Sequence, residues 1–246
     1  MLEGMLAETI GITGHNGDTI QAYYARPITA DPVPGVVVLH HMPGWDEWSK
    51  EVARKLAYHG YAAICPHLYS RLGPGRWEDV AAAARAQGGV SDAQVIGDSA
   101  GAAAFLRAQP YSIGRVGAIG FCSGGRQAYM LACRIAVDAA VDCWGGAVIV
   151  SPDQLTPQRP VAVVDMTPDM HTPLLGIFGN DDANPDPAQV NRTEEELKRL
   201  GKQYEFYRYD GAGHGFFAVD RPSYRPQQAV DAWTRVFAFF GKHLGK

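Results

Sequence analysis

Residues 117–129 read GAIGFCSGGRQAY, and this short segment places Cys122 and Ser123 side by side. The apolar run that ends at the cysteine is typical of a buried strand, and the small residues that follow it open a helical pattern. A nucleophilic side chain is commonly presented on a sharp turn of this kind, between a strand and a helix. The segment therefore predicts a reactive side chain at this turn, with the cysteine and the serine as the two candidates.

The spacing of the glycines distinguishes the two candidates. Such a strained turn needs small residues two positions before and two positions after the nucleophile. Around Cys122 these positions hold Gly120 and Gly124. Around the serine they hold Phe121 and Gly125, and a phenylalanine is too large for the tight position. The spacing therefore favours Cys122 as the nucleophile.

Strand-like and helix-like segments alternate along most of the chain. Segments 8–13 and 19–25 predict an N-terminal antiparallel hairpin around a turn at 14–18. Further strands are predicted at 35–41, 61–68, 114–121, 139–145, 173–179 and 203–210, and helices at 46–60, 91–109, 123–135, 187–201 and 226–244. Such alternation indicates a mostly parallel central sheet with helices on both faces. Together with the nucleophile turn, it predicts an α/β fold of the α/β-hydrolase type.

Two stretches, 71–80 and 147–172, are irregular and contain proline and many polar residues. Each follows a predicted strand, where this kind of fold keeps its binding loops, so we expect binding loops there. No repeat, linker or compositional break divides the chain. With 246 residues, 46% of them hydrophobic, residues 1–246 are predicted to form a single domain.

Composition argues against several kinds of partner. The net charge is −4 and no basic run is present, so neither nucleic acid nor an anionic membrane surface is an expected partner. No apolar run approaches the ~20 residues of a membrane span, and the first residues lack the features of a signal peptide. The four cysteines show no C-x-x-C spacing. We therefore expect a cytoplasmic protein with reduced cysteines, no metal and no cofactor, and the sequence carries no signal for its oligomeric state.

Three histidines follow Cys122 in the sequence, and the fold type predicts the order nucleophile, acid, histidine. His243 falls in the last turn of the C-terminal helix and His171 in a loop before a strand, so both are expected at the surface. His214 comes directly after the predicted strand 203–210, among glycines. A loop at the carboxyl end of a strand is where this chemistry needs its base, so His214 is the predicted base.

The acid of such a triad is expected after the strand at 173–179, in the segment GNDDANP. This segment offers two adjacent carboxylates, Asp181 and Asp182. Residues of this type also form turns, so the local pattern leaves both as candidates.

Three motifs now occur in order: GFCSGG, FGNDDANP and GAGHGF. Together with CPHLYSR they resemble the dienelactone hydrolase family, cysteine-dependent α/β-hydrolases, over nearly the whole chain. In that family the acid ends a G-x-x-D turn, which corresponds here to Gly179 and Asp182. The resemblance therefore implies Asp182 as the acid, Cys122 as the nucleophile and His214 as the base.

An oxyanion hole for this chemistry needs two backbone N–H groups. One is expected from Ser123, the residue after the nucleophile. The resemblance implies that Met42 supplies the other. Just before that position the family carries a glutamate implicated in activating the cysteine, whereas this sequence has His41. An imidazole cannot act as that carboxylate does, so activation is expected to differ; alternatively, His40 and His41 simply end a strand.

The family also holds a substrate carboxylate with arginines, and one of those positions is Ala218 in this sequence. Other side chains are therefore candidates for substrate binding. Those in loops are Arg71, Arg76 and Arg221, and those that either line an apolar pocket or belong to the core are Trp45, Trp144, Phe216 and Phe217.

The leading hypothesis is a hydrolase of carboxylic esters or lactones that acts on a small-molecule substrate. Attack by a thiolate gives a thioester, which water then hydrolyses. Because thiolate is a good leaving group, such an enzyme suits activated esters such as enol lactones better than amides. Two alternatives from other classes are a non-catalytic α/β-hydrolase-fold protein that binds a small ligand, and a redox-sensing thiol at Cys122. The spacing of the cysteines offers no resolving partner for the second alternative.

Overall fold

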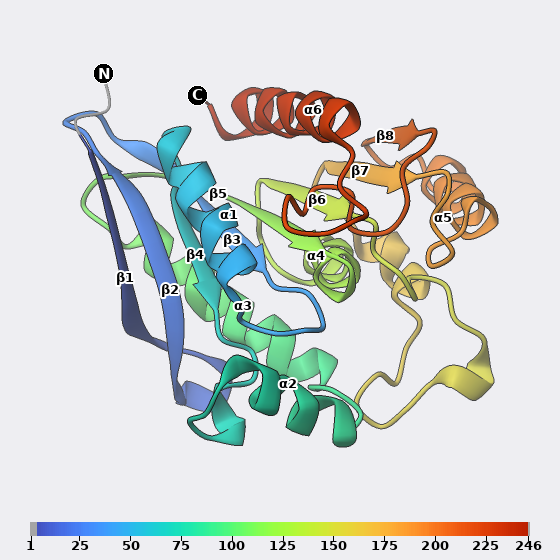
Figure 1. The fold of residues 1–246 in the computed structure, drawn as a ribbon, viewed down its shortest axis with the longest axis horizontal. Helices are drawn as coiled ribbons and strands as arrows, with labels where there is room; N and C mark the ends of the chain where they lie inside the picture. Colours follow the sequence, from blue (N-terminus) through green and yellow to red (C-terminus); the bar gives the residue numbers. More distant parts are fainter. Residues whose placement is uncertain (1–3, 246) are drawn as a thin grey trace.

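All eight strands of residues 4–245, the part of the chain that this computed structural model describes, belong to one sheet (Figure 1). Their order across the sheet is β1-β2-β4-β3-β5-β6-β7-β8. The strands are β1 (Gly4–Thr13), β2 (Thr19–Ile28), β3 (Val33–Leu39), β4 (Ala62–Pro66), β5 (Ser112–Phe121), β6 (Ala139–Cys143), β7 (Leu174–Gly179) and β8 (Tyr204–Tyr209). Residues 1–3 and 246, which the single-domain prediction includes, lie outside the described residues.

The sheet is mostly parallel. Strands β3 to β8 run parallel to their neighbours within this set, whereas β1 pairs antiparallel with β2, and β2 pairs antiparallel with β4. The first two strands form the predicted hairpin, and Asn16 in its turn adopts a left-handed conformation with φ of 57°. Asparagine tolerates this conformation better than most residues. The predicted α/β-hydrolase fold class is confirmed.

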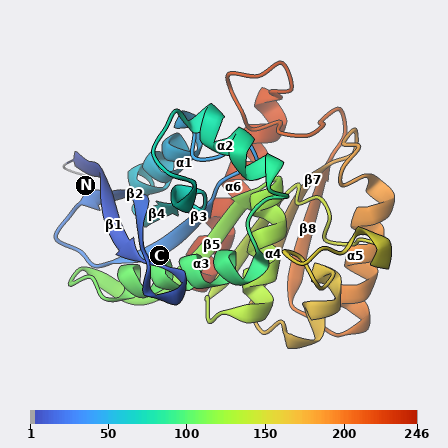
Figure 2. The same ribbon diagram turned by 90° about the horizontal axis from the view of Figure 1, so that it is seen from below.

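Helices cover both faces of the sheet (Figures 1 and 2). They are α1 (Glu47–Tyr58), α2 (Trp77–Ala86), α3 (Asp92–Arg107), α4 (Ser123–Arg134), α5 (Pro187–Arg199) and α6 (Pro226–Leu244). On one face α1 and α6 share a core that contains Leu56 and Phe240. On the other face α3 and α4 share a core that contains Leu106 and Leu131. None of the helices in residues 4–245 has both the length and the apolar character needed to cross a membrane.

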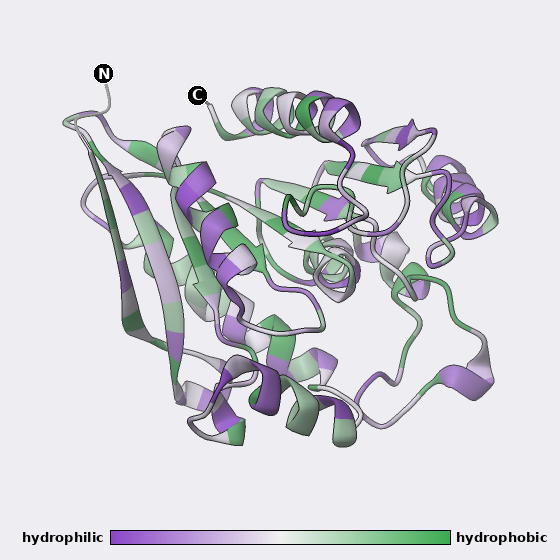
Figure 3. Cartoon of the chain, in the orientation of Figure 1, coloured by the Kyte–Doolittle hydropathy of each residue, from purple (hydrophilic) through white to green (hydrophobic). Residues whose placement is uncertain are grey.

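The central strands are buried on both faces, as their apolar sequences predict. Residues 36–39 of β3 are fully buried. Figure 3 shows apolar residues along the central strands and hydrophilic residues over α5. Because the carboxyl ends of parallel strands lie at one edge of the sheet, the loops after β3, β5, β7 and β8 come together at that edge, and they carry the site described below.

The prediction of an irregular stretch at 71–80 is wrong for its C-terminal part, because α2 begins at Trp77. The sequence from this residue to Ala86 is rich in alanine, which has the highest intrinsic helix propensity. The helix also buries an apolar stripe that includes Val80 and Ala84. Burial of this stripe against the rest of the fold stabilises the helix. The glycines and the proline that precede it made its start unpredictable from the sequence.

The second irregular stretch, 147–172, contains only short 3-10 helices, Pro152–Gln154 and Val163–Asp169. The backbone N–H of Asp92, at the start of α3, donates to the carbonyl of Gln158 at 2.9 Å. This long loop is therefore attached to the helical layer rather than standing free of it.

A buried ion pair joins the N-terminal hairpin to α3. The Asp98 side chain is fully buried, and its two oxygens accept hydrogen bonds from the terminal nitrogens of Arg71 at 2.8 and 2.9 Å. Its Oδ1 also accepts the backbone N–H of His15, in the hairpin turn, at 2.8 Å. Arg71 Nε donates to the half-exposed Asp18 at 2.7 Å. The four groups together fix the turn of the hairpin against the helix.

Substitution of Asp98 by Asn tests this role of the ion pair. Asp98→Asn replaces an acceptor oxygen by an NH₂ group next to the partly exposed Arg71, which keeps only Asp18 as a carboxylate partner, so we expect the free energy of unfolding to fall by about 1–3 kcal/mol. The matched variant Asp18→Asn affects an exposed pair and is expected to cost less than about 1 kcal/mol. Urea unfolding monitored by circular dichroism measures both. Equal losses in the two variants would contradict a special role for the buried carboxylate.

Candidate active site

Cys122 lies at the turn between β5 and α4 with φ of 56° and ψ of −117°. A positive φ is uncommon for a residue with a side chain and persists only when the surroundings enforce it. Here the cysteine N–H donates to the carbonyl of Cys143 at 3.0 Å, and its carbonyl accepts the N–H of Arg126 at 3.2 Å. The strained conformation points the side chain away from the sheet at the N-terminus of α4.

The flanking glycines are required by close backbone contacts. A Cβ atom at Gly120 would lie 1.8 Å from the carbonyl oxygen of Gly124. A Cβ atom at Gly124 would lie 2.2 Å from the carbonyl oxygen of Leu39. Both distances are far below any real contact of a Cβ, so the turn packs against itself and against β3 only if both positions are glycine.

His214 and Asp182 lie side by side in the loops after β8 and β7. The Nδ1 of His214 and the Oδ2 of Asp182 are 2.8 Å apart. The other oxygen of Asp182 accepts the backbone N–H of Asn184 at 2.8 Å, and this side chain is only 2% exposed. Asp181, the alternative from the sequence, is exposed. Of the two adjacent carboxylates, Asp182 is the one that contacts the histidine.

Charge interactions link His214 to Cys122. Burial alone would raise the pKa of the Cys122 thiol, but the interaction with the His214 imidazole and the N–H groups of Ser123 and Met42 outweigh it, so the pKa is lowered. Burial likewise opposes protonation of His214, yet Asp182 and Cys122 together raise its pKa to about 10. The two shifts together favour a thiolate paired with an imidazolium over the neutral thiol and imidazole. The N-terminal end of α4 adds a favourable dipole.

The same two backbone N–H groups, from Ser123 and Met42, act on the sulfur of Cys122 from two different loops. Donors that converge beside a nucleophile are positioned for the oxygen of a carbonyl under attack. These are the two residues that the sequence nominates for the oxyanion hole.

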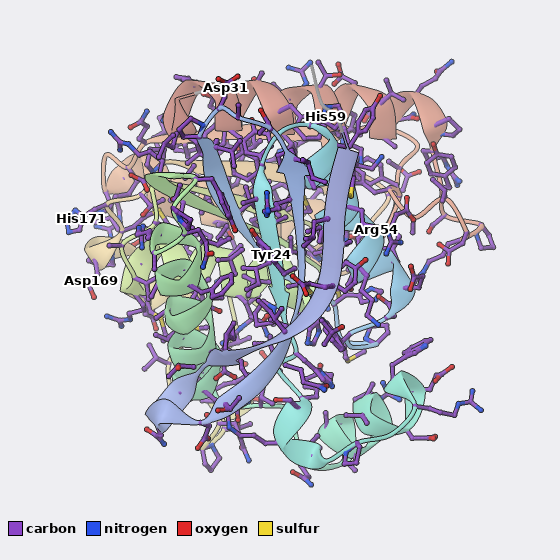
Figure 4. The ribbon with its side chains drawn as sticks, turned by 90° about the vertical axis from the view of Figure 1, so that its left-hand side faces the viewer. Tyr24, Asp31, Arg54, His59, Asp169 and His171 are labelled. Carbon is purple, nitrogen blue, oxygen red and sulfur yellow. The ribbon has the colours of Figure 1, made fainter. Side chains whose placement is uncertain are left out.

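The other two histidines after the nucleophile lie elsewhere. His171 is exposed, as expected, and is labelled at the edge of the molecule in Figure 4. The expectation of a surface position for His243 is wrong in part. Its Nε2 is buried, and its ring packs against Phe239 with 4.5 Å between the ring centroids. The buried aromatic face of α6 therefore continues into its last turn, which the sequence had predicted to be exposed to solvent.

Cys122 stands between two cavities, both of which also include Met42. The larger has a volume of about 450 Å³, within the range of small-molecule sites. The smaller has a volume of about 180 Å³. His214 lines the smaller cavity and Ser123 lines the larger one.

Two arginines that the sequence did not nominate line the larger cavity. Arg85 comes from the end of α2 and Arg159 from the loop 147–172. Neither forms an ion pair with a carboxylate within the described residues; Arg85 is exposed and Arg159 is half-buried at the cavity wall. In contrast, Arg126 is held by a bidentate pair with Asp92 at 2.7 and 2.9 Å. The helix-forming composition of α2 is the signal that would have drawn attention to Arg85.

The smaller cavity is largely aromatic. Trp144 and Phe121 line it together with Arg221, which the sequence nominates for substrate binding. His41 also lines it, and its Nε2 lies 2.5 Å from the Oδ2 of Asp46. His41 therefore does not merely end a strand, since it follows β3 and lines the same cavity as Cys122.

Five of the nominated residues line neither of the two cavities beside Cys122. Arg71, Arg76 and Trp45 line a separate cavity, of about 950 Å³, that does not include the cysteine. Arg71 is bound to Asp98 as described above. Phe216 is fully buried against Trp144 and belongs to the core.

Arg76 is exposed and pairs with Glu78, at 3.2 Å, beside the start of α2. Trp45 stacks on His67 with 4.8 Å between the ring centroids, and its indole N–H donates to the carbonyl of Cys65. Phe217, the other aromatic candidate, is also buried, against Trp144. Sequence position alone cannot separate such loop and core residues from residues that line the site.

Among residues 4–245 no group of three or more His, Cys, Asp or Glu side chains is arranged to hold a metal ion. The polar groups around Cys122 are instead arranged as donor and acceptor pairs, which suits proton transfer and anion stabilisation.

Comparison with known proteins places the chain in a family. The profile of the dienelactone hydrolase family matches residues 20–244. A protein of Methylorubrum extorquens, named provisionally as a carboxymethylenebutenolidase, is 34% identical over 98% of this chain and 82% of its own length. A protein of Escherichia coli with the same provisional name is 32% identical over 94% of this chain and 85% of its own length.

Solved structures agree with the sequence relatives. A crystal structure from Klebsiella pneumoniae, described provisionally as a dienelactone hydrolase, is 30% identical, with a TM-score of 0.87 over 98% of this chain and 100% of that one. A dienelactone hydrolase-like promiscuous phosphotriesterase from metagenomic libraries, at 22% identity and a TM-score of 0.78, shares the fold. Because the family profile and these relatives extend over nearly the whole chain, the protein belongs to the dienelactone hydrolase family and is a hydrolase.

Proposed function

We propose that this protein hydrolyses carboxylic esters or lactones through a thioester on Cys122, with His214 and Asp182 completing a catalytic triad. The proposal rests on one observation: a buried carboxylate contacts an imidazole, which in turn acts on a thiol held at positive φ. A nucleophile, its partner base and an orienting acid in this arrangement form the generalised triad.

Acylation starts from the ion pair. The Cys122 thiolate attacks the carbonyl carbon, and the N–H groups of Ser123 and Met42 stabilise the oxyanion that forms. The carbon–oxygen bond of the ester then breaks, and the leaving oxygen departs as an anion or takes a proton from His214. Asp182 keeps the imidazole oriented throughout. Water hydrolyses the thioester and regenerates the thiolate.

Charge in the larger cavity supports an anionic substrate. Arg85 and Arg159 face this cavity without a carboxylate partner among the described residues. Burial and the nearby charge of Arg126 lower the pKa of Arg159, so a bound anion would relieve an unfavourable environment. The provisional name of the relatives denotes a butenolide, which is a lactone, with a carboxymethylene group. We propose that the acyl part of the substrate carries a carboxylate that these arginines bind.

Replacement of the nucleophile tests the covalent step. Cys122→Ala is expected to lower kcat for p-nitrophenyl acetate by about 10⁴-fold or more, because the acyl group has no acceptor. Ser123→Ala is the matched control, since only the backbone N–H of that residue is used, and its kcat should stay within about threefold of the native value. Stopped assays followed by intact-protein mass spectrometry measure turnover and the acyl adduct. Substantial turnover by Cys122→Ala would exclude the triad.

The ion pair predicts selective reactivity of one cysteine. At neutral pH, iodoacetamide should alkylate Cys122 faster than Cys65, Cys133 and Cys143, whose pKa values are raised by burial. The rate should fall as the pH drops through the lowered pKa of Cys122, since only the thiolate reacts.

Removal of the partner histidine tests the cause of this reactivity. In His214→Gln burial is no longer outweighed, so the pKa of Cys122 should rise and its alkylation at neutral pH should slow by about tenfold for each unit of pKa. Peptide mass spectrometry of partly alkylated protein measures the rate at each cysteine. An unchanged rate in this variant would show that the imidazole does not stabilise the thiolate.

Charge selectivity tests the role of the two arginines. Arg85→Ala and Arg159→Ala should each raise KM for the p-nitrophenyl monoester of succinic acid by about tenfold to a hundredfold, because a charge-assisted contact is lost. KM for neutral p-nitrophenyl acetate should be unaffected. Arg76→Ala, an exposed arginine outside the cavity, is the control. An equal change of KM for both esters would contradict binding of the carboxylate by these side chains.

A further inference from the structure

A second imidazole–carboxylate pair lies beside the nucleophile. His41 Nε2 and Asp46 Oδ2 are 2.5 Å apart, and the two side chains are only 7% and 8% exposed. Asp46 Oδ1 also accepts the N–H and the hydroxyl of Ser49 at 2.9 and 2.8 Å. Burial opposes ionisation of Asp46, but the hydrogen bonds from His41 and Ser49 outweigh it and lower the pKa of this carboxyl. At neutral pH Asp46 is therefore a carboxylate.

The carboxylate fixes the tautomer of His41. A carboxylate only accepts hydrogen bonds, so the proton of the neutral ring lies on Nε2 and Nδ1 keeps a free lone pair. No group among residues 4–245 forms a hydrogen bond to Nδ1, and Nδ1 is not one of the buried atoms that lack a partner. Trp48 packs on the ring with 5.3 Å between the centroids and restricts its orientation. His41 is thus a firmly held side chain that lines the cavity, and Nδ1 of its neutral ring has no hydrogen-bond partner among residues 4–245.

The cavity brings this base to the reacting atoms. Cys122, His41 and His214 all line the space of about 180 Å³ beside the sulfur. A water molecule in a space of this size can contact the thioester carbonyl and an imidazole at once. Two imidazoles, His41 and His214, each paired with its own carboxylate, therefore line the same cavity as Cys122.

Hydrolysis of the acyl-enzyme creates a need for a second base. When the leaving group is an enolate or a phenolate, it departs as an anion and His214 keeps its proton. His214 carries the proton that it took from the Cys122 thiol, and its contact with Asp182 stays in place. A protonated imidazole cannot take a proton from water. His41 is not part of the pair with Cys122, and a ring that donates its single proton from Nε2 to Asp46 has Nδ1 free to accept one.

We propose that His41, oriented by Asp46, is the general base for the water that hydrolyses the acyl-enzyme; this inference rests on the proposed function. The water O–H bond breaks, its proton moves to His41 Nδ1, and the oxygen bonds to the thioester carbon. The tetrahedral oxyanion then collapses, the carbon–sulfur bond breaks, and its electron pair returns to Cys122 as thiolate. The acid product ionises, and His41 releases its proton to solvent. His41 is a catalytic residue in this step and Asp46 is a positioning residue.

Pre-steady-state kinetics with a p-nitrophenyl ester separate the two chemical steps. In His41→Gln the first release of p-nitrophenolate should stay within about threefold of the native rate, whereas steady-state turnover should fall by about 10²-fold or more. The acyl adduct on Cys122 should then accumulate, as seen by intact-protein mass spectrometry. Hydroxylamine, a stronger nucleophile than water, should restore turnover because it needs less help from a base.

Matched variants separate catalysis from structure. Asp46→Asn should also accumulate the adduct, with a smaller fall in turnover, because the ring loses its fixed tautomer but keeps its nitrogen. His171→Gln makes the same chemical change on the surface and should behave as the native protein. If His41→Gln does not fold, Asp46→Asn decides the matter by the same two readouts.

Three outcomes would overturn the inference: native deacylation in both variants, a loss of the first release equal to the loss of turnover, or no rescue by hydroxylamine. Failure of the proposed function looks different. In that case the native protein turns over the ester without any adduct on Cys122, and Cys122→Ala remains active.

Discussion

The positive φ of Cys122 is the constraint on which the rest of the site depends. It turns the chain sharply from β5 into α4, so that the sulfur stands above the sheet at the N-terminus of a helix. The turn is possible only because Gly120 and Gly124 leave room for backbone contacts that a Cβ would fill. One of these contacts is with the carbonyl of Leu39, so the same packing fixes the turn against β3, whose following loop supplies His41 and the second N–H donor.

The features that could be predicted from the sequence are those with local causes. The glycine spacing locates the turn at Cys122, and the order of elements places His214 after a strand. Asp182 could be chosen over its neighbour only through the family motif, because both carboxylates have the same local pattern. Arg85 and Arg159 could not be predicted, since they reach the cavity through tertiary contacts of α2 and of the loop 147–172.

The site combines two kinds of electrostatic environment around one sulfur. On one side, two arginines that have no carboxylate partner among residues 4–245 line a cavity of about 450 Å³. On the other side, aromatic rings surround two imidazoles, each bound to a buried carboxylate. In the proposed mechanism, proton transfer therefore takes place on one side of the sulfur and recognition of the substrate's charge on the other. A substrate group that binds in the larger cavity therefore does not contact the His214–Asp182 and His41–Asp46 pairs.

Met42 lines both cavities, and its backbone and its side chain are constrained to different degrees. Its N–H is fixed by the backbone and directed at the sulfur, while its side chain is 48% exposed where the two cavities meet. A substitution of Met42 can alter the shape of both cavities without removing the backbone N–H donor. Substitutions of the Met42 side chain can therefore change which substrates fit the two cavities, while the backbone N–H of this residue stays in place.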